Sequence, residues 1–250
     1  MMFENLRAYL EDQPNPGPEY RDKIEALEEI IDASIDNPFL FIRALRHRSS
    51  LNDGKHDQTD SYERLEFLGD AVLDLIVSEI IFDLFPQEDE GFLTKLRAKL
   101  VNRDALAKYA KKLGLGPLII VGDRSQGQGI EYSKSALSDV FESLIGAIYI
   151  NKGYDKAAGF ASTIIEQCMD VKELTTTLEN YKSMLLEYAQ AQKMTIPRYE
   201  VVEEMGPGHD KTFRIRAIVD EKERGQGVGK SKKEAEQKAA RQALIHLKKS

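Results

Sequence analysis

Three scarcities limit what this chain can be. It has one cysteine, Cys168, in 250 residues, which excludes a disulfide framework and a cysteine-based zinc site. No stretch reaches the ~18 consecutive apolar residues of a membrane-spanning helix. The first residues lack the basic segment and following apolar segment that mark a secretory signal. We therefore expect a cytoplasmic protein with no membrane association.

Acidic residues outnumber basic ones overall, 42 to 35. The formal net charge is −7, which argues against a general nucleic-acid binder. The deficit is uneven, because residues 1–173 carry 20 Lys+Arg and 31 Asp+Glu, whereas residues 174–250 carry 15 and 11. An acidic body with a basic C-terminal part indicates two modules with different tasks.

Apolar periodicity divides the chain in the same way. The first part has no strand pattern, and its helical spacing predicts helices over 22–35, 39–46, 62–85, 92–101, 103–113, 134–151 and 154–169. The second part predicts a helix over 181–192, strands over 198–205, 212–219 and 222–226, and a helix over 231–248. The expected fold is a mainly α N-terminal domain and a small α+β domain of order α-β-β-β-α. The expected boundaries are an extension over 1–22, a helical domain over 23–172, a linker over 173–180 and the small domain over 181–249.

Two acidic stretches lie inside strongly apolar helical segments. On a helix that turns ~100° per residue, Glu63, Glu66 and Asp70 share a stripe about 60° wide. Asp139 and Glu142, three residues apart, repeat the pattern in a second apolar segment. Carboxylates brought together in this way repel one another and are costly to desolvate unless a cation compensates them.

A metal site is therefore one interpretation of these stretches, because packing of the two helices through their apolar faces would bring the acidic stripes to one edge. Oxygen-only ligands favour Mg²⁺, with Mn²⁺ as a possible substitute, over zinc. Clustered carboxylates that hold such ions are typical of phosphodiester displacement. A solvated acidic helix face is the alternative, which the spacing alone leaves open. Phe67 lies beside the acids, where a second chain would cover its ring.

The basic part contains a glycine-rich segment, GQGVGKS at 225–231. It is not a P-loop, because Arg224 stands where that pattern needs a glycine, so no nucleotide cofactor is expected. Ser231 and Glu234 fit a capping box at the start of a helix. Lys232 and Lys233 then oppose the helix dipole at ~0.3–1 kcal/mol each, a cost that a bound phosphate would offset. Tolerated surface lysines are the alternative.

Taken together, these segments resemble the bacterial ribonuclease III family. The segment ERLEFLGDAVL at 63–73 is similar to the family's nuclease motif, and HRS at 47–49, EGFL at 90–93 and DVFE at 139–142 accompany it in the family's order. The C-terminal part, with GPGH at 206–209 and KSKKEAE at 230–236, is similar to a double-stranded-RNA-binding domain. The resemblance spans roughly residues 25–248.

The resemblance implies a role for each matching residue. Glu66, Asp139 and Glu142 would be metal ligands, and Asp70 and Glu142 would be catalytic. The auxiliary acidic and dimer-edge positions would be Glu63, Phe67 and Glu90. The RNA contacts of the small domain would be Glu187, Gln190, His209, Lys230, Lys232 and Lys233. Leu186 stands where related enzymes often have glutamine, which leaves fine site preference open.

The implied activity is Mg²⁺-dependent hydrolysis of both strands of double-stranded RNA by a homodimer. The products would carry 5′-phosphates and short 3′ overhangs, and the substrates would be ribosomal RNA precursors and other structured transcripts.

The first alternative is a non-catalytic double-stranded-RNA-binding protein on the same scaffold. Loss of Glu66, Asp70, Asp139 or Glu142 would favour that alternative, and all four are present. The second alternative is an acidic helical protein with an unrelated basic tail.

Overall fold

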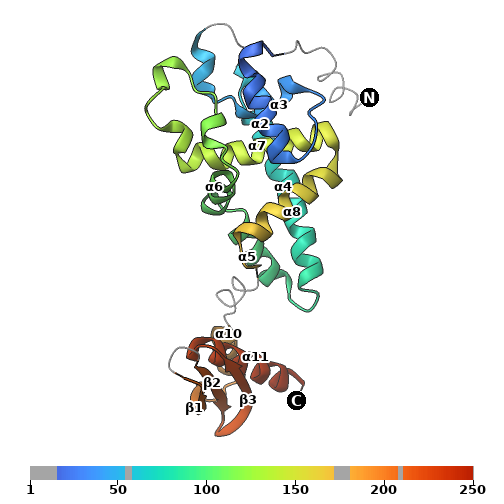
Figure 1. Cartoon of the computed structure of the whole chain (residues 1–250). Coiled ribbons are helices and arrows are strands. Elements are labelled where there is room, and N and C mark those ends of the chain that lie inside the picture. The colour runs from blue at the N-terminus through green and yellow to red at the C-terminus, as the bar shows by residue number, and fades with distance from the viewer. Residues whose placement is uncertain (1–15, 54–57, 172–180, 208–210, 250) are drawn as a thin grey trace, which may run out of the picture. The chain divides into compact units, whose positions relative to one another are not determined.

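The chain divides into two units, residues 1–170 and 171–250. The structure, a computed structural model, describes residues 16–53, 58–171, 181–207 and 211–249 (Figure 1). Most of the expected extension over 1–22 and all of the expected linker over 173–180 lie outside the described residues.

The first unit is helical, as the periodicity predicts. Its α-helices are α2 (Arg21–Ile31), α3 (Pro38–Leu45), α4 (Glu63–Leu84), α5 (Glu90–Leu100), α6 (Arg103–Lys112), α7 (Lys134–Lys152) and α8 (Tyr154–Cys168). Short 3₁₀ turns occupy Pro18–Tyr20, Arg48–Asp53, Gln58–Asp60, Gly116–Leu118, Asp123–Ser125 and Ile130–Tyr132. Helix α7 runs across the middle of the unit (Figure 1) and buries most of its length, including Val140, Phe141, Leu144, Ile145 and Ile148.

The predicted end of the first helix, at residue 35, is wrong. Helix α2 stops at Ile31 because Asp32 adopts a left-handed conformation with φ 49°. The Glu28 carboxylate then accepts a hydrogen bond from the Ile35 N–H at 2.7 Å. Ile35 is buried although it lies beyond the helix. Its apolar side chain therefore extended the helical pattern past the true end.

Two glycines allow α4 and α7 to cross at very close range. A Cβ atom built on Gly69 of α4 would overlap the carbonyl oxygen of Glu142 on α7. A Cβ atom on Gly146 of α7 would lie 2.5 Å from the carbonyl oxygen of Leu65 on α4. Each helix thus presents a glycine to the backbone of the other. A side chain at either position would force the helices apart.

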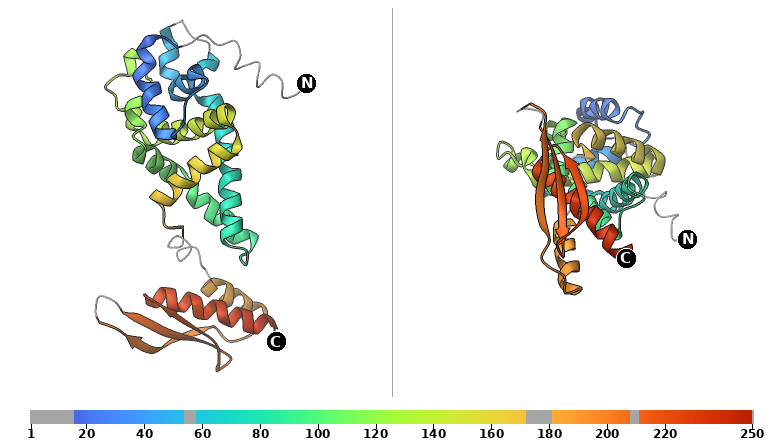
Figure 2. Two further views of the ribbon diagram at one scale, coloured as in Figure 1. Left: turned by 45° about the vertical axis from the view of Figure 1, so that its right-hand side comes forward. Right: turned by 90° about the horizontal axis from the view of Figure 1, so that it is seen from below.

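The second unit has the predicted α-β-β-β-α order. It consists of α10 (Tyr181–Ala191), β1 (Arg198–Met205), β2 (Thr212–Val219), β3 (Lys222–Gly229) and α11 (Lys232–Lys249). The strands form an antiparallel sheet in the order β1-β2-β3. Asp220 and Glu221 join β2 to β3 with φ of 53° and 57°, which suits a tight two-residue hairpin turn. Figure 2 shows both helices on one face of the sheet.

Strand β3 runs to Gly229, past the predicted end at Gln226. Its glycines Gly225, Gly227 and Gly229 alternate toward α11, where a Cβ on any of them would lie within 3 Å of helix backbone atoms. The facing helix positions are Ala235, Ala239 and Ala243, all fully buried. The glycine-rich segment is therefore a packing surface between strand and helix. Low strand propensity of glycine explains why the pattern ended too early.

Replacing Gly69 with alanine tests the helix crossing. Gly69→Ala should lower the midpoint of thermal unfolding by more than about 5 °C, because an overpacked contact costs about 1–3 kcal/mol or more. Gly159→Ala in α8 is the matched control, since a Cβ there meets nothing within 4 Å. The control should unfold at an unchanged or higher temperature. Equal behaviour of the two variants in differential scanning calorimetry would contradict the close crossing.

Candidate metal centre and RNA-binding surface

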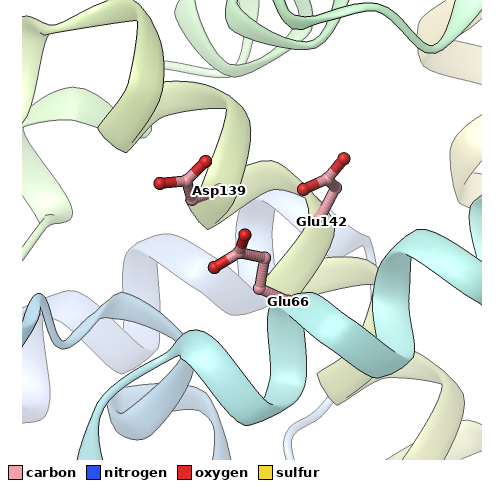
Figure 3. Close-up of side chains that lie close together, drawn as sticks. All are labelled: Glu66, Asp139 and Glu142. Atoms are coloured by element: carbon pink, nitrogen blue, oxygen red, sulfur yellow. The ribbon is translucent and has the colours of Figure 1, made fainter.

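Three carboxylates meet where α4 and α7 cross. Glu66 extends from the first turns of α4, and Asp139 and Glu142 extend from consecutive turns of α7 (Figure 3). One oxygen from each side chain lies within 4.8 Å of the others. Because the Cβ of an alanine at position 69 would meet the Glu142 carbonyl, the helices approach very closely at a member of the cluster. The crossing therefore determines the spacing of the cluster.

The cluster strongly perturbs two of its members. Burial first, and then the charges of neighbouring carboxylates including Asp139, raise the pKa of Glu66 to about 7 and that of Glu142 to about 8. The positive charge of Arg103 opposes both shifts. Three oxygen donors without a nitrogen or sulfur donor fit a hard divalent cation, whose charge would remove this repulsion. The residues present thus fit a divalent metal ion.

Hydroxyl groups hold Asp139 in place. Tyr62 and Ser135 each donate a hydrogen bond to Oδ2 at 3.3 Å, and Ser138 donates to Oδ1 at 3.2 Å. Burial first, and then the charge of Asp139, raise the pKa of the Tyr62 hydroxyl above its usual range, so it remains a donor. Sequence reasoning missed Tyr62. Nothing in the sequence pairs it with a residue 77 positions away.

A hollow of about 640 Å³ borders the cluster. Its lining combines the carboxylates of Glu66 and Asp139 with polar and cationic side chains, including His47, Arg48, Tyr62, Ser133 and Ser135. Burial lowers the pKa of His47, with the charge of Arg48 acting in the same direction. A hollow of this composition can admit a phosphodiester beside the carboxylates.

The other predicted acidic positions lie outside the three-carboxylate cluster. Asp70 is exposed on α4 one turn after Glu66, and burial and then the charge of Asp74 raise its pKa. Glu63 is exposed and lies 3.8 Å from Arg48. Glu90 is the exposed first residue of α5, where its carboxylate accepts a hydrogen bond from Thr94 at 2.8 Å.

Phe67 is the most exposed large apolar side chain in the described part of the chain, at 82%. Leu75 and Phe82 follow on α4 at intervals of eight and seven residues, with exposures of 51% and 68%. These intervals place the three side chains on one face of the helix. The stripe includes Phe67, the aromatic residue for which we expect a contact with a second chain.

Five of the six predicted RNA-binding residues lie on or beside the helices of the second unit. Glu187 and Gln190 are exposed on α10, and Lys232 and Lys233 are exposed in the first turn of α11. Lys230 is exposed two positions before the start of that helix. His209 lies outside the described residues. Four of these five exposed side chains thus extend to solvent from regular helices.

The capping box forms in a modified way. Ser231 Oγ accepts a hydrogen bond from the Glu234 N–H at 3.2 Å, as predicted. The Glu234 carboxylate accepts from the Lys230 N–H at 2.7 Å, one residue before the expected partner. Glu234 also pairs with Lys238 at 2.6 Å. The cap fixes the backbone that carries Lys230 and Lys232.

Two arginines of β2, Arg214 and Arg216, are already paired with acids. Arg216 lies 2.8 Å from Glu200, and Arg214 lies 3.5 Å from Glu203, in both cases directly across β1 and β2. These cross-strand pairs neutralise the sheet face. The start of α11 therefore carries the less compensated positive charge, which favours this helix end over the sheet as the phosphate contact.

No helix in the described ranges combines the length and apolar character needed to cross a membrane.

A helical body with a carboxylate centre and a separate α-β-β-β-α domain are the parts expected of a nuclease with an RNA-binding domain. Family models agree, since residues 37–168 match the Ribonuclease-III-like model and residues 181–247 match the double-stranded RNA binding motif. The chain belongs to the ribonuclease III family, and it is an endoribonuclease.

Individual relatives support this assignment. The chain is 42% identical to Ribonuclease 3 of Chlorobaculum tepidum over 213 residues, which is 84% of this chain and 78% of the relative. It is 40% identical to Ribonuclease 3 of a Geobacillus species over 228 residues, 91% of this chain and 92% of the relative. Among solved structures, the ribonuclease III nuclease domain of Campylobacter jejuni matches with TM-score 0.54 and 40% identity, covering 58% of this chain and 98% of that domain.

The raised pKa values predict how pH affects stability. Glu66 and Glu142 titrate near 4.5 when unfolded but at about 7 and about 8 when folded, so the folded state binds more protons between these values. The unfolding temperature of the metal-free protein should therefore fall from about pH 5 to about pH 8. Added Mg²⁺ or Mn²⁺ should raise it, and more at the higher pH.

The double variant Glu66→Gln, Glu142→Gln is the control, because glutamine keeps the shape and removes both ionisable groups. It should lose this part of the pH dependence and most of the stabilisation by metal. A metal-free wild-type chain that gained stability relative to the double variant across the same pH range would contradict the assigned shifts.

Proposed function

We propose that this chain hydrolyses both strands of double-stranded RNA with Mg²⁺, leaving 5′-phosphates and short 3′ overhangs. The single observation that carries this proposal is the convergence of Glu66, Asp139 and Glu142 within 4.8 Å in a ribonuclease III-family chain. The proposed substrates are ribosomal RNA precursors and other structured transcripts, encountered in the cytoplasm.

Glu66, Asp139 and Glu142 would hold the metal, with Mn²⁺ as a possible substitute for Mg²⁺. When bound, such an ion activates water and stabilises the developing charge on the leaving oxygen. Asp70 lies one turn from Glu66 and outside the three-carboxylate cluster. Its carboxylate is therefore available to accept a proton from the attacking water. Glu142, with its raised pKa, would be both a ligand and a catalytic group.

We further infer that the working form is a homodimer. The stripe of Phe67, Leu75 and Phe82 on α4 exposes three large apolar side chains on one face, as protein contacts commonly do. In the related nuclease domain of Campylobacter jejuni, structural flexibility has been described in a region involved in dimer formation. Glu63 and Glu90 would then act at the edge of this contact, beside the RNA.

The second unit would supply affinity for the duplex. Glu187 and Gln190 on α10 and His209 before β2 would contact the minor groove. Lys230, Lys232 and Lys233 would contact phosphates across the major groove. Domains of this kind recognise A-form shape and 2′-hydroxyl groups over ~16 base pairs rather than sequence. The metal-independent binding step and the metal-dependent cutting step would thus belong to different units.

The variant Glu142→Gln should bind duplex RNA normally but cleave it at least about 100-fold more slowly. Changing a group that only orients a metal ligand lowers activity by about 10–100-fold. Removing a ligand itself should lower it by more. The cleavage rate is measured on end-labelled duplex RNA with Mg²⁺ or with EDTA. Duplex binding is measured by gel retardation in EDTA.

Glu166→Gln on the exposed face of α8 makes the same chemical change away from the cluster and should cleave normally. Undiminished cleavage by Glu142→Gln would refute the assigned role. Wild-type chain that retards duplex RNA but never cuts it with Mg²⁺ would instead favour the non-catalytic RNA-binding alternative.

Replacing Lys232 and Lys233 with alanine should weaken duplex binding and reduce the slope of log affinity against log salt concentration by about one per lysine. The same change should leave the unfolding temperature unchanged or raise it, because both cations oppose the helix dipole. Lys248→Ala, at the other end of α11, is the control. It should leave the salt slope unchanged and lower the unfolding temperature, because a cation at the C-terminal end of a helix favours the helix dipole. An unchanged salt slope in fluorescence anisotropy titrations would exclude these lysines from the phosphate contact.

A further inference from the structure

Tyr62 connects segments that supply different metal ligands, although the proposed chemistry does not use it. It is 4% exposed and directly precedes α4. Its N–H donates to the Arg46 carbonyl at 2.9 Å, which ties it to the end of α3. Its carbonyl accepts from the Glu66 N–H at 2.8 Å. The backbone of Tyr62 is therefore fixed relative to the first ligand.

The ring of Tyr62 is also fixed. It packs edge-on against His47, with ring centroids 5.8 Å apart and planes at 64°. His47 is held in turn, because its backbone N–H donates to the Ile120 carbonyl at 2.9 Å and its Nδ1 lies 2.8 Å from Ser49 Oγ. Rotation of the tyrosine side chain away from α7 would break this aromatic contact.

The hydroxyl of Tyr62 reaches across to the second helix. It donates to Asp139 Oδ2 at 3.3 Å. The other two donors, Ser135 and Ser138, belong to α7 itself. Among the described residues, Tyr62 is the only donor outside α7 that hydrogen-bonds to Asp139. One residue thus joins the backbone of Glu66 to the side chain of Asp139.

We propose that Tyr62 is a positioning residue that orients the Asp139 carboxylate toward the metal and keeps it aligned with Glu66; this inference rests on the proposed metal site. A carboxylate that binds a metal must remain ionised and correctly rotated, and an outer hydrogen-bond donor serves both needs. Ser135 and Ser138 move with α7, so they cannot align Asp139 with a ligand on α4. Tyr62 can, because its backbone belongs to the start of α4.

The variant Tyr62→Phe tests this role in the full-length chain, because it keeps the ring and its contact with His47 and removes only the hydroxyl. Mn²⁺ binding without RNA, followed by electron paramagnetic resonance, should weaken about 10-fold or more. The Mg²⁺ concentration for half-maximal cleavage should rise by a similar factor. The cleavage rate at saturating Mg²⁺ should stay within about threefold of wild type, since the ligands themselves remain.

Tyr109→Phe is the matched control. Tyr109 is fully buried, and its hydroxyl donates to the Leu100 carbonyl at 3.0 Å instead of to the cluster. Its loss should lower the unfolding temperature without changing Mn²⁺ affinity. Unchanged Mn²⁺ affinity in Tyr62→Phe, or an equal loss in both variants, would overturn the positioning role.

Failure of the proposed function would look different. A wild-type chain that neither bound Mn²⁺ nor cleaved RNA with Mg²⁺ would overturn the metal site itself, and this inference with it. A wild-type chain that binds and cleaves, beside a Tyr62→Phe variant with unaltered Mn²⁺ affinity, would overturn only the role of the tyrosine.

Discussion

The close crossing of α4 and α7 is the constraint on which the catalytic unit depends. Helices in contact usually keep their axes 8–10 Å apart because side chains separate them. Here Gly69 and Gly146 remove that separation, each against the backbone of the other helix. The approach brings Glu66 beside Asp139 and Glu142 and raises the pKa of two of the three. The same contact that stabilises the fold by packing thus creates an electrostatic strain that a cation can relieve.

The two units divide attraction and chemistry between them. The first concentrates negative charge at one point and therefore would repel an RNA backbone without a bound cation. The second pairs Arg214 and Arg216 of β2 with acids and exposes lysines at the start of α11. A chain with net charge −7 can therefore still present a locally positive surface to a polyanion. Net charge alone would have indicated the wrong partner.

Most of the fold could be predicted from sequence because it follows local patterns. The alternation in β2 and the apolar spacing of α7 gave correct elements, with Ile215, Ala217 and Val219 buried on one face. The errors lie where a nonlocal contact replaces local preference. Asp32 ends α2 in a left-handed conformation, and the glycines of β3 stay extended because α11 covers them. The acidic positions were visible as stripes, but Tyr62 was not, since only the folded chain brings its hydroxyl to Asp139.

Strand β3 packs on α11 because the spacing of every second strand residue nearly equals the spacing of every fourth helix residue. Two residues of a strand span about 6.6 Å, and four residues of a helix span about 6 Å, so glycines at every second position can meet alanines at every fourth. This match fixes the register of β3 against α11. A shift of one residue along β3 would bring Gln226 and Val228 against the helix and lose three contacts at once. Insertions in this strand should therefore be far rarer among functional variants than insertions in the turn that precedes it.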